Sequence, residues 1–268
     1  MLNSLTTLKS RWRSGTTTTN AWLAIPDALP AEIAARTGVD SLCIDMQHGL
    51  VDQAAAVRIL QATSGTGVPV LVRVAWNEPA TLMRALDAGA AGVIVPMVNG
   101  GEEARAAVAA CRYPPVGIRS FGPVRPALTE GPGYFAAAND AVLVFAMIET
   151  RRALDELDAI VATDGLDGVY IGPADLSLAL DLAPEMDSVV ELHQTTVKRI
   201  FQTAKLHGKF VGMHCNSAEF AATAAGWGAD FVTVVTDTTA LRVEMSGRVA
   251  RFHELLALTK APAANKLP

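Results

Sequence analysis

The sequence predicts a (β/α)8 barrel, the TIM-barrel fold, and three observations lead to this fold class. Short apolar runs alternate with alanine-rich helical stretches eight times in a chain of 268 residues. Many of the runs are apolar throughout, as strands covered on both faces should be. No GxGxxG motif follows the first run, so the main alternative, a doubly wound sheet, lacks support. Eight strand–helix units in one chain therefore favour a closed barrel.

The order of these runs defines the expected elements. Strands are expected at 21–25, 40–44, 69–74, 91–95, 142–148, 167–171, 209–214 and 230–235. Helices are expected at 29–37, 52–63, 78–88, 101–111, 150–162, 187–206, 216–226 and 238–258. Because no linker divides the chain, we expect one barrel domain over 1–268, with a flexible tail at 259–268.

The first 20 residues allow two interpretations. They are rich in Ser and Thr and hold three basic residues and no acidic ones, a composition shared by organelle transit peptides. Leu2, Leu5 and Leu8 nevertheless have helical spacing, and Gly15 follows them. We therefore favour a short leading helix and loop over 1–20.

Composition narrows the classes of function. The net charge of −5 argues against a nucleic-acid binder, which usually carries a basic patch. No run reaches the roughly 18 apolar residues of a membrane span. Three cysteines without CxxC spacing, and no secretory signal, fit a reducing cytoplasm. We expect a cytoplasmic protein whose partners are small molecules, with no nucleic acid and no membrane.

One long proline- and glycine-rich segment, 113–134, follows the fourth expected strand. A loop of this length in a compact domain is usually functional or part of an assembly. We expect it to line a substrate pocket, where Arg119 and Arg125 would either meet an acidic substrate or form ion pairs with a neighbour.

Two carboxylates lie just beyond adjacent expected strands. In a barrel of this kind the active site is built at the carboxyl ends of the strands. Glu149 follows the fifth strand in "MIET", and Asp175 follows the sixth in "IGPADLS". Together they could bind a hard divalent ion such as Mg²⁺, which takes one or two protein carboxylates. Both could instead cap helices, since each lies at an expected helix start.

Arg73 and His48 lie at the ends of two other strands. A guanidinium within the apolar run "VLVRV" must find an anion, which could be a structural carboxylate or a substrate. His48, in "IDMQHG", is on its own more often structural. Beside a metal and an arginine, a neutral imidazole is a suitable base near pH 7.

Five motifs occur in an order that resembles a known family. They are "IDMQHG", "LVRV", "LDAGAAGVIVPMV", "IET" and "GVYIGPADLS". Together they resemble the HpcH/HpaI aldolases, the metal-dependent class II pyruvate aldolases, from about Trp22 to Thr239. The resemblance implies a (β/α)8 barrel of the phosphoenolpyruvate/pyruvate-binding type. It also implies a homo-hexamer in which the last helix is exchanged between subunits, and a divalent metal ion (Mg²⁺, Mn²⁺ or Co²⁺).

The resemblance assigns roles to residues that match these motifs. Glu149 and Asp175 match the metal ligands. Arg73 matches the arginine at the keto oxygen and developing enolate, and His48 matches the catalytic base. Asp87 of "LDAG" matches the carboxylate partner of that base, reached across a subunit or through a metal-bound water. The matched substrate-binding residues are Trp22, Asp45, Gly172, Pro173 and Ala174, the last three as the turn that holds the pyruvate carboxylate.

Three pocket positions depart from the usual pattern of the family. Gln47 stands where a glutamate often precedes the histidine, and Met147 stands where a glutamine often precedes "IE". His214 ends the seventh expected strand where many relatives have an apolar residue. None of these changes removes a predicted metal ligand, so we include the three residues among those that contact substrate and determine specificity.

The activity implied by the resemblance is reversible aldol cleavage of a 4-hydroxy-2-oxo acid to pyruvate, or a related 2-oxo acid, and an aldehyde. The enzyme would be a carbon–carbon lyase that works through a metal-stabilised enolate. No Schiff-base lysine is needed, and none of the expected strands ends in one. The alternatives are a CoA-thioester lyase of the citryl or malyl type, another enolate reaction such as oxaloacetate decarboxylation, and a non-catalytic barrel kept for binding or assembly.

Overall fold

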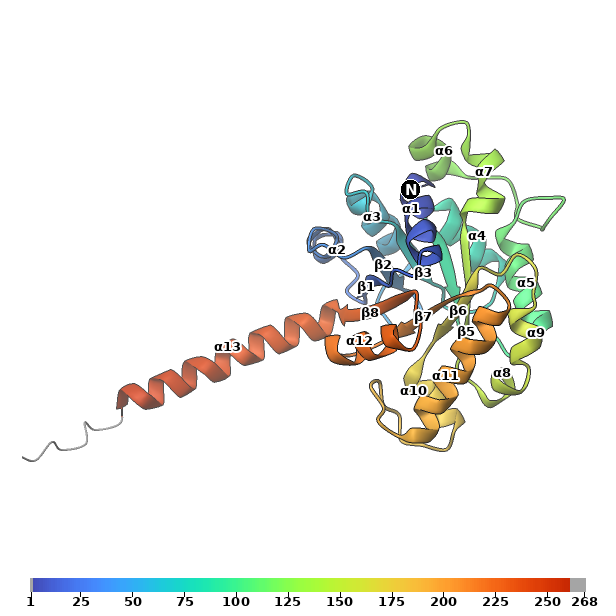
Figure 1. The fold of residues 1–268 in the computed structure, drawn as a ribbon. Helices are drawn as coiled ribbons and strands as arrows, with labels where there is room; N and C mark the ends of the chain where they lie inside the picture. The colour runs from blue at the N-terminus through green and yellow to red at the C-terminus, as the bar shows by residue number, and fades with distance from the viewer. Residues whose placement is uncertain (1, 261–268) are drawn as a thin grey trace, which may run out of the picture.

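The computed structural model describes the backbone of residues 2–260 and the side chains of residues 5–259. Eight parallel strands close into a barrel in chain order, which confirms the predicted (β/α)8 fold (Figure 1). The strands are β1 (Thr18–Leu23), β2 (Ser41–Asp45), β3 (Val70–Arg73), β4 (Gly92–Val95), β5 (Leu143–Ile148), β6 (Gly168–Ile171), β7 (Phe210–His214) and β8 (Phe231–Thr236). Their bounds follow the predicted runs closely, with β1 starting three residues early.

Helices surround the barrel in the order that the sequence predicts, with several additions. They are α1 (Leu2–Arg13), α2 (Ala28–Ala35), α3 (Gln53–Thr63), α4 (Pro79–Asp87), α5 (Gly101–Cys111), α6 (Val124–Glu130), α7 (Tyr134–Ala141), α8 (Arg151–Asp155), α9 (Leu157–Val161), α10 (Pro173–Ala179), α11 (Glu191–Leu206), α12 (Ala218–Gly226) and α13 (Asp237–Lys260). The expected helix at 150–162 is divided at Glu156 into α8 and α9. Helices α6 and α7 were not predicted, and α10 was expected only as a helix start at "GPAD".

The alternation of side chains along each strand produces two separate cores. On β2, Leu42 and Ile44 join the cluster between barrel and helices, whereas Cys43 joins the cluster inside the barrel. The interior has little spare room. A Cβ on Gly212 would lie 2.4 Å from the Phe231 ring and 2.7 Å from Tyr170, so this strand position must lack a side chain.

The leading helix closes the amino-terminal end of the barrel. Leu5, Leu8 and Trp12 of α1 belong to the interior cluster. The Trp12 ring stacks on Phe231 at 5.2 Å, and its Nε1 donates to Thr18 Oγ1 at 2.8 Å. This packing supports the interpretation of 1–20 as a helix and loop of the fold.

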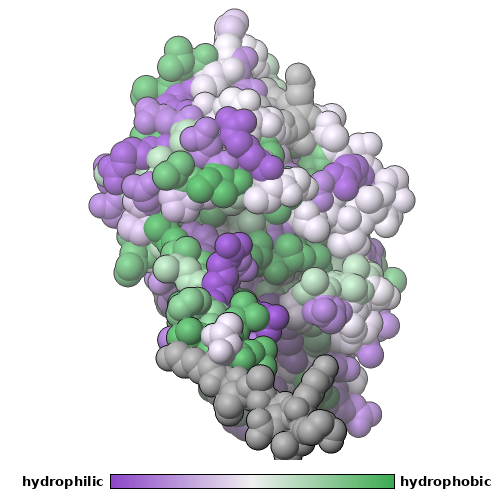
Figure 2. All heavy atoms as spheres, turned by 90° about the vertical axis from the view of Figure 1, so that its left-hand side faces the viewer, coloured by the Kyte–Doolittle hydropathy of each residue, from purple (hydrophilic) through white to green (hydrophobic). Residues whose placement is uncertain are grey.

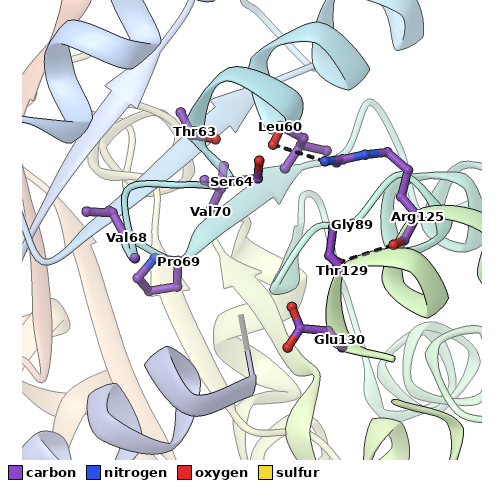
Figure 3. A pocket seen from close by; sticks show the side chains of 11 residues that line it. Leu60, Thr63, Ser64, Val68, Pro69, Val70, Gly89, Arg125, Thr129 and Glu130 are labelled. Atoms are coloured by element: carbon purple, nitrogen blue, oxygen red, sulfur yellow. Dashed lines mark hydrogen bonds between the residues drawn. The ribbon is translucent and has the colours of Figure 1, made fainter. Parts of the chain in front are cut away.

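Segment 113–134 lies at the end of the barrel opposite to the one that we expected. It connects α5 to α7 and β5, so it is a helix-to-strand connection at the amino-terminal ends of the strands. Arg119 bonds to Asp87, and Arg125 Nη1 donates to the Ala88 carbonyl at 2.6 Å. Arg125 borders a cavity of about 190 Å³ beside the start of β3 (Figure 3). Within one protomer, the expectation that this loop lines the substrate pocket is wrong.

The last helix leaves the barrel. α13 begins at the end of β8 and extends away from the body of the protein (Figure 1). Its direction is set at its first residue, because the Asp237 carboxylate accepts hydrogen bonds from the N–H groups of Ala24 and Ile25, both at 3.0 Å. Of the expected tail, residues 259 and 260 end α13 and 261–268 lie outside the described residues. Among the helices described, none has the length and apolar character needed to cross a membrane.

Candidate active site

A pocket of about 150 Å³ lies at the carboxyl ends of the strands, where the sequence placed the site. Its lining includes eight of the predicted residues, namely His48, Arg73, Met147, Gly172, Pro173, Ala174, Asp175 and His214. An adjoining hollow is lined by Glu149 and again by Asp175. Residues from five different strand ends therefore meet around one space, as the barrel topology requires.

Asp45 and Arg73 form a two-point ion pair beneath this pocket. The barrel register places the two residues side by side at the ends of β2 and β3. Arg73 Nε donates to Asp45 Oδ1 at 2.9 Å, and Nη2 donates to Oδ2 at 2.6 Å. Burial opposes the charge on Asp45, but the bonds and charge of Arg73 outweigh it and lower the pKa of the carboxyl. Arg73 thus has a carboxylate of the protein as its anion, one of the two alternatives that the sequence left open. Its Nη1 makes no hydrogen bond to any described residue.

Trp22 supports the arginine from inside the barrel. The Arg73 guanidinium lies over the Trp22 ring, 5.0 Å from its centroid, and Tyr170 stacks on the same tryptophan at 5.5 Å. Trp22 is 2% exposed and forms no part of the pocket surface. Trp22 and Asp45, which were predicted as pocket residues, therefore both contact Arg73 and hold its guanidinium in place.

Glu149 is a buried carboxylate that the fold holds in place without a basic partner. It follows β5, is 2% exposed, and its Oε1 accepts a bond from the Met97 N–H at 2.7 Å. Burial, and then the nearby charge of Asp175, raise the pKa of Glu149 to about 7. The N-cap of α8 is Thr150, whose side chain accepts from the Ala153 N–H. The helix-capping alternative for Glu149 is therefore wrong.

Asp175 lies in the first turn of α10 and lines both spaces. Gly172, which precedes this helix, packs against Glu149 so closely that a Cβ there would lie 2.4 Å from Glu149 Oε2. The turn "GPAD" thereby brings the two carboxylates to the same wall. No cluster of three or more His, Cys, Asp or Glu side chains with the geometry of a metal site occurs among the described residues.

A divalent cation fits this pair. Two carboxylates are the number that Mg²⁺ commonly takes from a protein, with water and substrate completing its shell. The raised pKa of Glu149 is consistent with a cation here, because burial and the Asp175 carboxylate raise it to about 7 and the charge of Arg73 does not offset them. The donor set is all oxygen, which suits Mg²⁺ and Mn²⁺.

His48 is the exposed member of the pocket lining. Its backbone N–H donates to Asp45 Oδ1 at 3.1 Å, which fixes the turn after β2. Its imidazole makes no hydrogen bond to a described residue and is accessible. The neighbouring Gln47 also donates its N–H to Asp45, at 3.0 Å, and its side-chain oxygen is buried without a partner. Gln47 does not line the pocket.

Asp87 is the predicted site residue that the protomer places elsewhere. It ends α4, at the amino-terminal end of the barrel, whereas His48 lies at the carboxyl end. Its Oδ1 accepts a bond from Arg119 Nη2 at 2.7 Å, and Arg119 also donates to Tyr134. Within one protomer Asp87 and His48 therefore cannot form a pair.

Sequence reasoning missed three residues of the site. Tyr170 and Met186 line the pocket, and Met97 positions Glu149 through its backbone. Tyr170 could have been found, because it lies two residues before Gly172 and so shares its strand face. Met97 has a left-handed φ of 55°, and Met186 lies in a loop. We find no sequence signal for either of these two.

The ion pair leads to a prediction about stability. Replacing Asp45 by Asn leaves Arg73 buried without its counter-ion, so we expect a loss of about 3 kcal/mol in the free energy of unfolding. Asp181→Asn is the matched control, because it breaks the Arg151–Asp181 pair, in which the side chains are 60% and 89% exposed. Urea unfolding at one protein concentration measures both. Equal effects of the two changes would contradict the anchoring role of Asp45.

Comparison with known proteins agrees with this geometry. The sequence model of the HpcH/HpaI aldolase/citrate lyase family matches residues 19–243. A hydroxypyruvate/pyruvate aldolase of Rhizorhabdus wittichii is 42% identical over 230 residues, which cover 86% of this chain and 92% of the relative. A 4-hydroxy-2-oxo-heptane-1,7-dioate aldolase of Salmonella arizonae is 36% identical over 249 residues, 91% of this chain and 93% of the relative. The crystal structure of an HpcH/HpaI family protein from Burkholderia cenocepacia, 30% identical, superposes with a TM-score of 0.85 over 92% of this chain and 99% of the other. The chain belongs to the HpcH/HpaI aldolase/citrate lyase family, as its five ordered motifs predicted.

Proposed function

We propose that the protein is a metal-dependent aldolase that reversibly cleaves 4-hydroxy-2-oxo acids into pyruvate, or a related 2-oxo acid, and an aldehyde. One observation carries the proposal. A buried carboxylate pair, an arginine anchored by its own counter-ion and an unpaired histidine line one small space at the mouth of the barrel. Both curated relatives described above are aldolases of 2-oxo acids, which supports the same reaction class.

The electron pair of the broken bond determines what the site must provide. Cleavage between C3 and C4 leaves two electrons on C3, and they delocalise onto the 2-oxo oxygen as an enolate. A divalent ion held by Glu149 and Asp175 (Mg²⁺, Mn²⁺ or Co²⁺) would supply Lewis-acid stabilisation of that charge. Arg73 Nη1 donates to the same oxygen from a guanidinium that Asp45 already holds in position. The backbone of 172–174, which lines the pocket, binds the substrate carboxylate.

His48 is the base of this proposal. It takes the proton of the 4-hydroxyl as the bond breaks and delivers a proton to C3 of the enolate to give the pyruvate methyl group; in the condensation direction it removes a methyl proton and protonates the new 4-hydroxyl. An exposed imidazole needs an orienting partner, and Asp87 cannot serve within the same protomer. We therefore assign the role to Asp87 of a second copy. The long loop that surrounds Asp87 would then approach the pocket of its neighbour, and not the pocket of its own barrel.

We propose a homo-hexamer with exchanged last helices, and an uncovered apolar stripe on α13 supports association between copies. Five exposed apolar side chains of α13, namely Leu241, Met245, Val249, Phe252 and Leu256, follow each other at intervals of three or four residues. They form one stripe, 37–60% exposed, that its own barrel does not cover. Figure 2 faces the side toward which α13 extends and shows apolar residues gathered in its lower half. Packing of this stripe on another copy supplies the missing cover.

Two rival functions lack the features that they require. A CoA-thioester lyase needs basic residues for the CoA phosphates near the mouth. The two candidates, Arg119 and Arg125, instead bond to protein groups at the opposite end. A non-catalytic barrel would not need an intact carboxylate pair.

The three cysteines are buried and free, which agrees with the reducing cytoplasm that we propose as the location of the protein.

The metal assignment has a direct test. With Mg²⁺ or Mn²⁺, the protein should exchange the methyl protons of pyruvate for deuterium in D₂O, and EDTA should stop the exchange. Glu149→Gln and Asp175→Asn should each slow exchange by about 10²-fold or more and weaken Mn²⁺ binding. Asp164→Asn, at the other end of the barrel, is the control and should change neither. Full activity in both site variants would contradict the metal site, and no exchange with any metal would contradict the enolate.

A change at His48 tests proton transfer separately from metal binding. His48→Asn should lower kcat/KM for aldol cleavage by about 10²–10⁴-fold, the usual contribution of a general base. Mn²⁺ affinity should stay at the wild-type value, because His48 is not assigned as a ligand. His207→Asn, on a distant surface, is the control. Cleavage at the wild-type rate by the His48 variant would exclude it as the base.

The assembly is tested on α13. Wild-type protein should show six times the protomer mass of 28.1 kDa in size-exclusion chromatography with light scattering. Phe252→Glu should dissociate it, because a charge replaces an apolar side chain of the stripe, and cleavage should be lost with Asp87 removed from its neighbour. Arg251→Gln makes the same change in net charge on the same helix and should leave the hexamer intact. A monomeric wild-type protein with full activity would contradict the exchange.

A further inference from the structure

Met97 holds the carboxylate of Glu149, and its own conformation needs support. Its N–H donates to Glu149 Oε1 at 2.7 Å, and this is the one hydrogen bond that the carboxylate makes to a described residue. Met97 follows β4 and has a left-handed φ of 55°. A residue with a side chain rarely adopts this conformation, which persists only where surrounding contacts hold it. The position of the Glu149 carboxylate therefore depends on what fixes Met97.

The side-chain amide of Asn99 supplies such a contact. Asn99 Nδ2 donates to the Met97 carbonyl at 2.7 Å, and Oδ1 accepts the Thr150 hydroxyl at 2.5 Å. Thr150 comes directly after Glu149 and is the N-cap of α8, because its Oγ1 accepts the Ala153 N–H at 3.0 Å. The amide thus bonds on one side to the residue that holds the carboxylate and on the other to the residue that follows it.

These hydrogen bonds close a ring through the chain. Its members, in order, are Glu149, Met97, Asn99 and Thr150, and the backbone joins the last to the first. Glu103, in the first turn of α5, anchors Asn99 from outside the ring, because its Oε2 accepts the Asn99 N–H at 2.7 Å. The ring holds Glu149 at both its side-chain end and its backbone end, so the loss of one member releases the carboxylate.

Asn99 itself lies behind the site. It lines neither the pocket nor the adjoining hollow, whose walls include Met97, Glu149 and Asp175. A direct contact with substrate or cation is therefore not its task. Only an amide of this length joins the two sides of the ring, since Met97 requires a donor and Thr150 requires an acceptor.

We propose that Asn99 is a positioning residue for the assigned metal ligand Glu149, which it holds through the two residues that it bonds. The proposal rests on the aldolase function and concerns the same site. Partners that hold a ligating carboxylate from outside typically contribute about 10–100-fold to metal affinity. Asn99→Ala removes both bonds of the ring, so it should weaken Mn²⁺ binding about 10-fold.

Binding is measured on the metal-free protein without substrate, from the electron paramagnetic resonance signal of free Mn²⁺. Asn139→Ala is the matched control. Asn139 is half-buried like Asn99, and it bonds to the N–H and the carbonyl of Tyr113, at 2.7 and 3.1 Å, near the other end of the barrel. Both changes remove an amide that bonds to backbone, so both should lower the free energy of unfolding in urea. Asn99→Ala alone should weaken Mn²⁺ binding.

The dependence of the rate on metal concentration separates positioning from general damage. In Asn99→Ala, the Mn²⁺ concentration for half-maximal deuterium exchange of pyruvate should rise about 10-fold. At saturating Mn²⁺ the rate should return to within about 3-fold of wild type, because excess cation restores occupancy by mass action. A rate that is low at every Mn²⁺ concentration, with unchanged affinity, would contradict the proposal.

Thr150 gives an independent test of the ring. Thr150→Val removes the hydroxyl with little change in shape, whereas Thr150→Ser retains it, so only the first should weaken Mn²⁺ binding. Combined with Asn99→Ala, Thr150→Val should weaken binding by less than the product of the two single fold-changes, because both break the same ring. Full additivity would show two separate effects and contradict the ring. If Asn99→Ala does not fold, the comparison of Thr150→Val with Thr150→Ser decides.

The outcomes separate this proposal from the one on which it rests. If wild-type protein binds Mn²⁺ and exchanges pyruvate protons but Asn99→Ala keeps the wild-type affinity, the metal site stands and the role of Asn99 is overturned. An equal loss of affinity in Asn139→Ala also overturns it, because the effect would then be one of general stability. If wild-type protein shows neither Mn²⁺ binding nor metal-dependent exchange, the proposed function itself fails.

Discussion

The ion pair between Asp45 and Arg73 is the contact on which the rest of the site depends. Barrel closure sets the two residues side by side on adjacent strands, so each buried charge finds its partner through the register of the sheet. The same carboxylate accepts the backbone N–H groups of Gln47 and His48. One side chain therefore holds both the guanidinium on β3 and the turn that carries the histidine on β2. Because Nε and Nη2 of Arg73 both bond to Asp45, Nη1 has a defined direction and, in the function that we propose, needs no rearrangement to meet a substrate oxygen.

Two buried carboxylates in this site have opposite environments, and the difference assigns their tasks. Asp45 has a guanidinium at hydrogen-bond distance and a lowered pKa, so it is already compensated and acts on its neighbours. Glu149 has one backbone N–H and a second carboxylate nearby, so burial raises its pKa to about 7 and the charge of Arg73 only partly opposes the rise. Asp45 is complete within the protein, whereas Glu149 and Asp175 are the pair to which we assign a cation. The same contrast between paired and unpaired acids separates structural from catalytic carboxylates in other enzymes.

The strands and most of the site could be predicted from sequence because both depend on short-range patterns. Apolar runs mark strands, and barrel topology brings whatever follows each strand to one rim, which is why Arg73, Glu149, Asp175 and His214 meet. Segment 113–134 was misplaced because it was read as following the fourth strand, although the expected helix at 101–111 lies between them. It follows a helix, so it lies at the far end. The left-handed Met97 and the break at Glu156 depend on tertiary contacts that no local pattern carries.

Three features of the single barrel have no partner within it. α13 carries apolar side chains that its own barrel does not cover, His48 has an imidazole without a partner, and Asp87 lies at the end opposite to it. Each of these is a cost for an isolated protomer, since exposed apolar surface favours association and an unoriented base is a poor catalyst. The exchange of helices that we propose would cover the first and, in the same step, bring residues of another copy to the mouth of each barrel. In that proposal the departure of α13, fixed by Asp237 against Ala24 and Ile25, links folding to catalysis, because the contact that covers the apolar helix is also the one that completes the histidine.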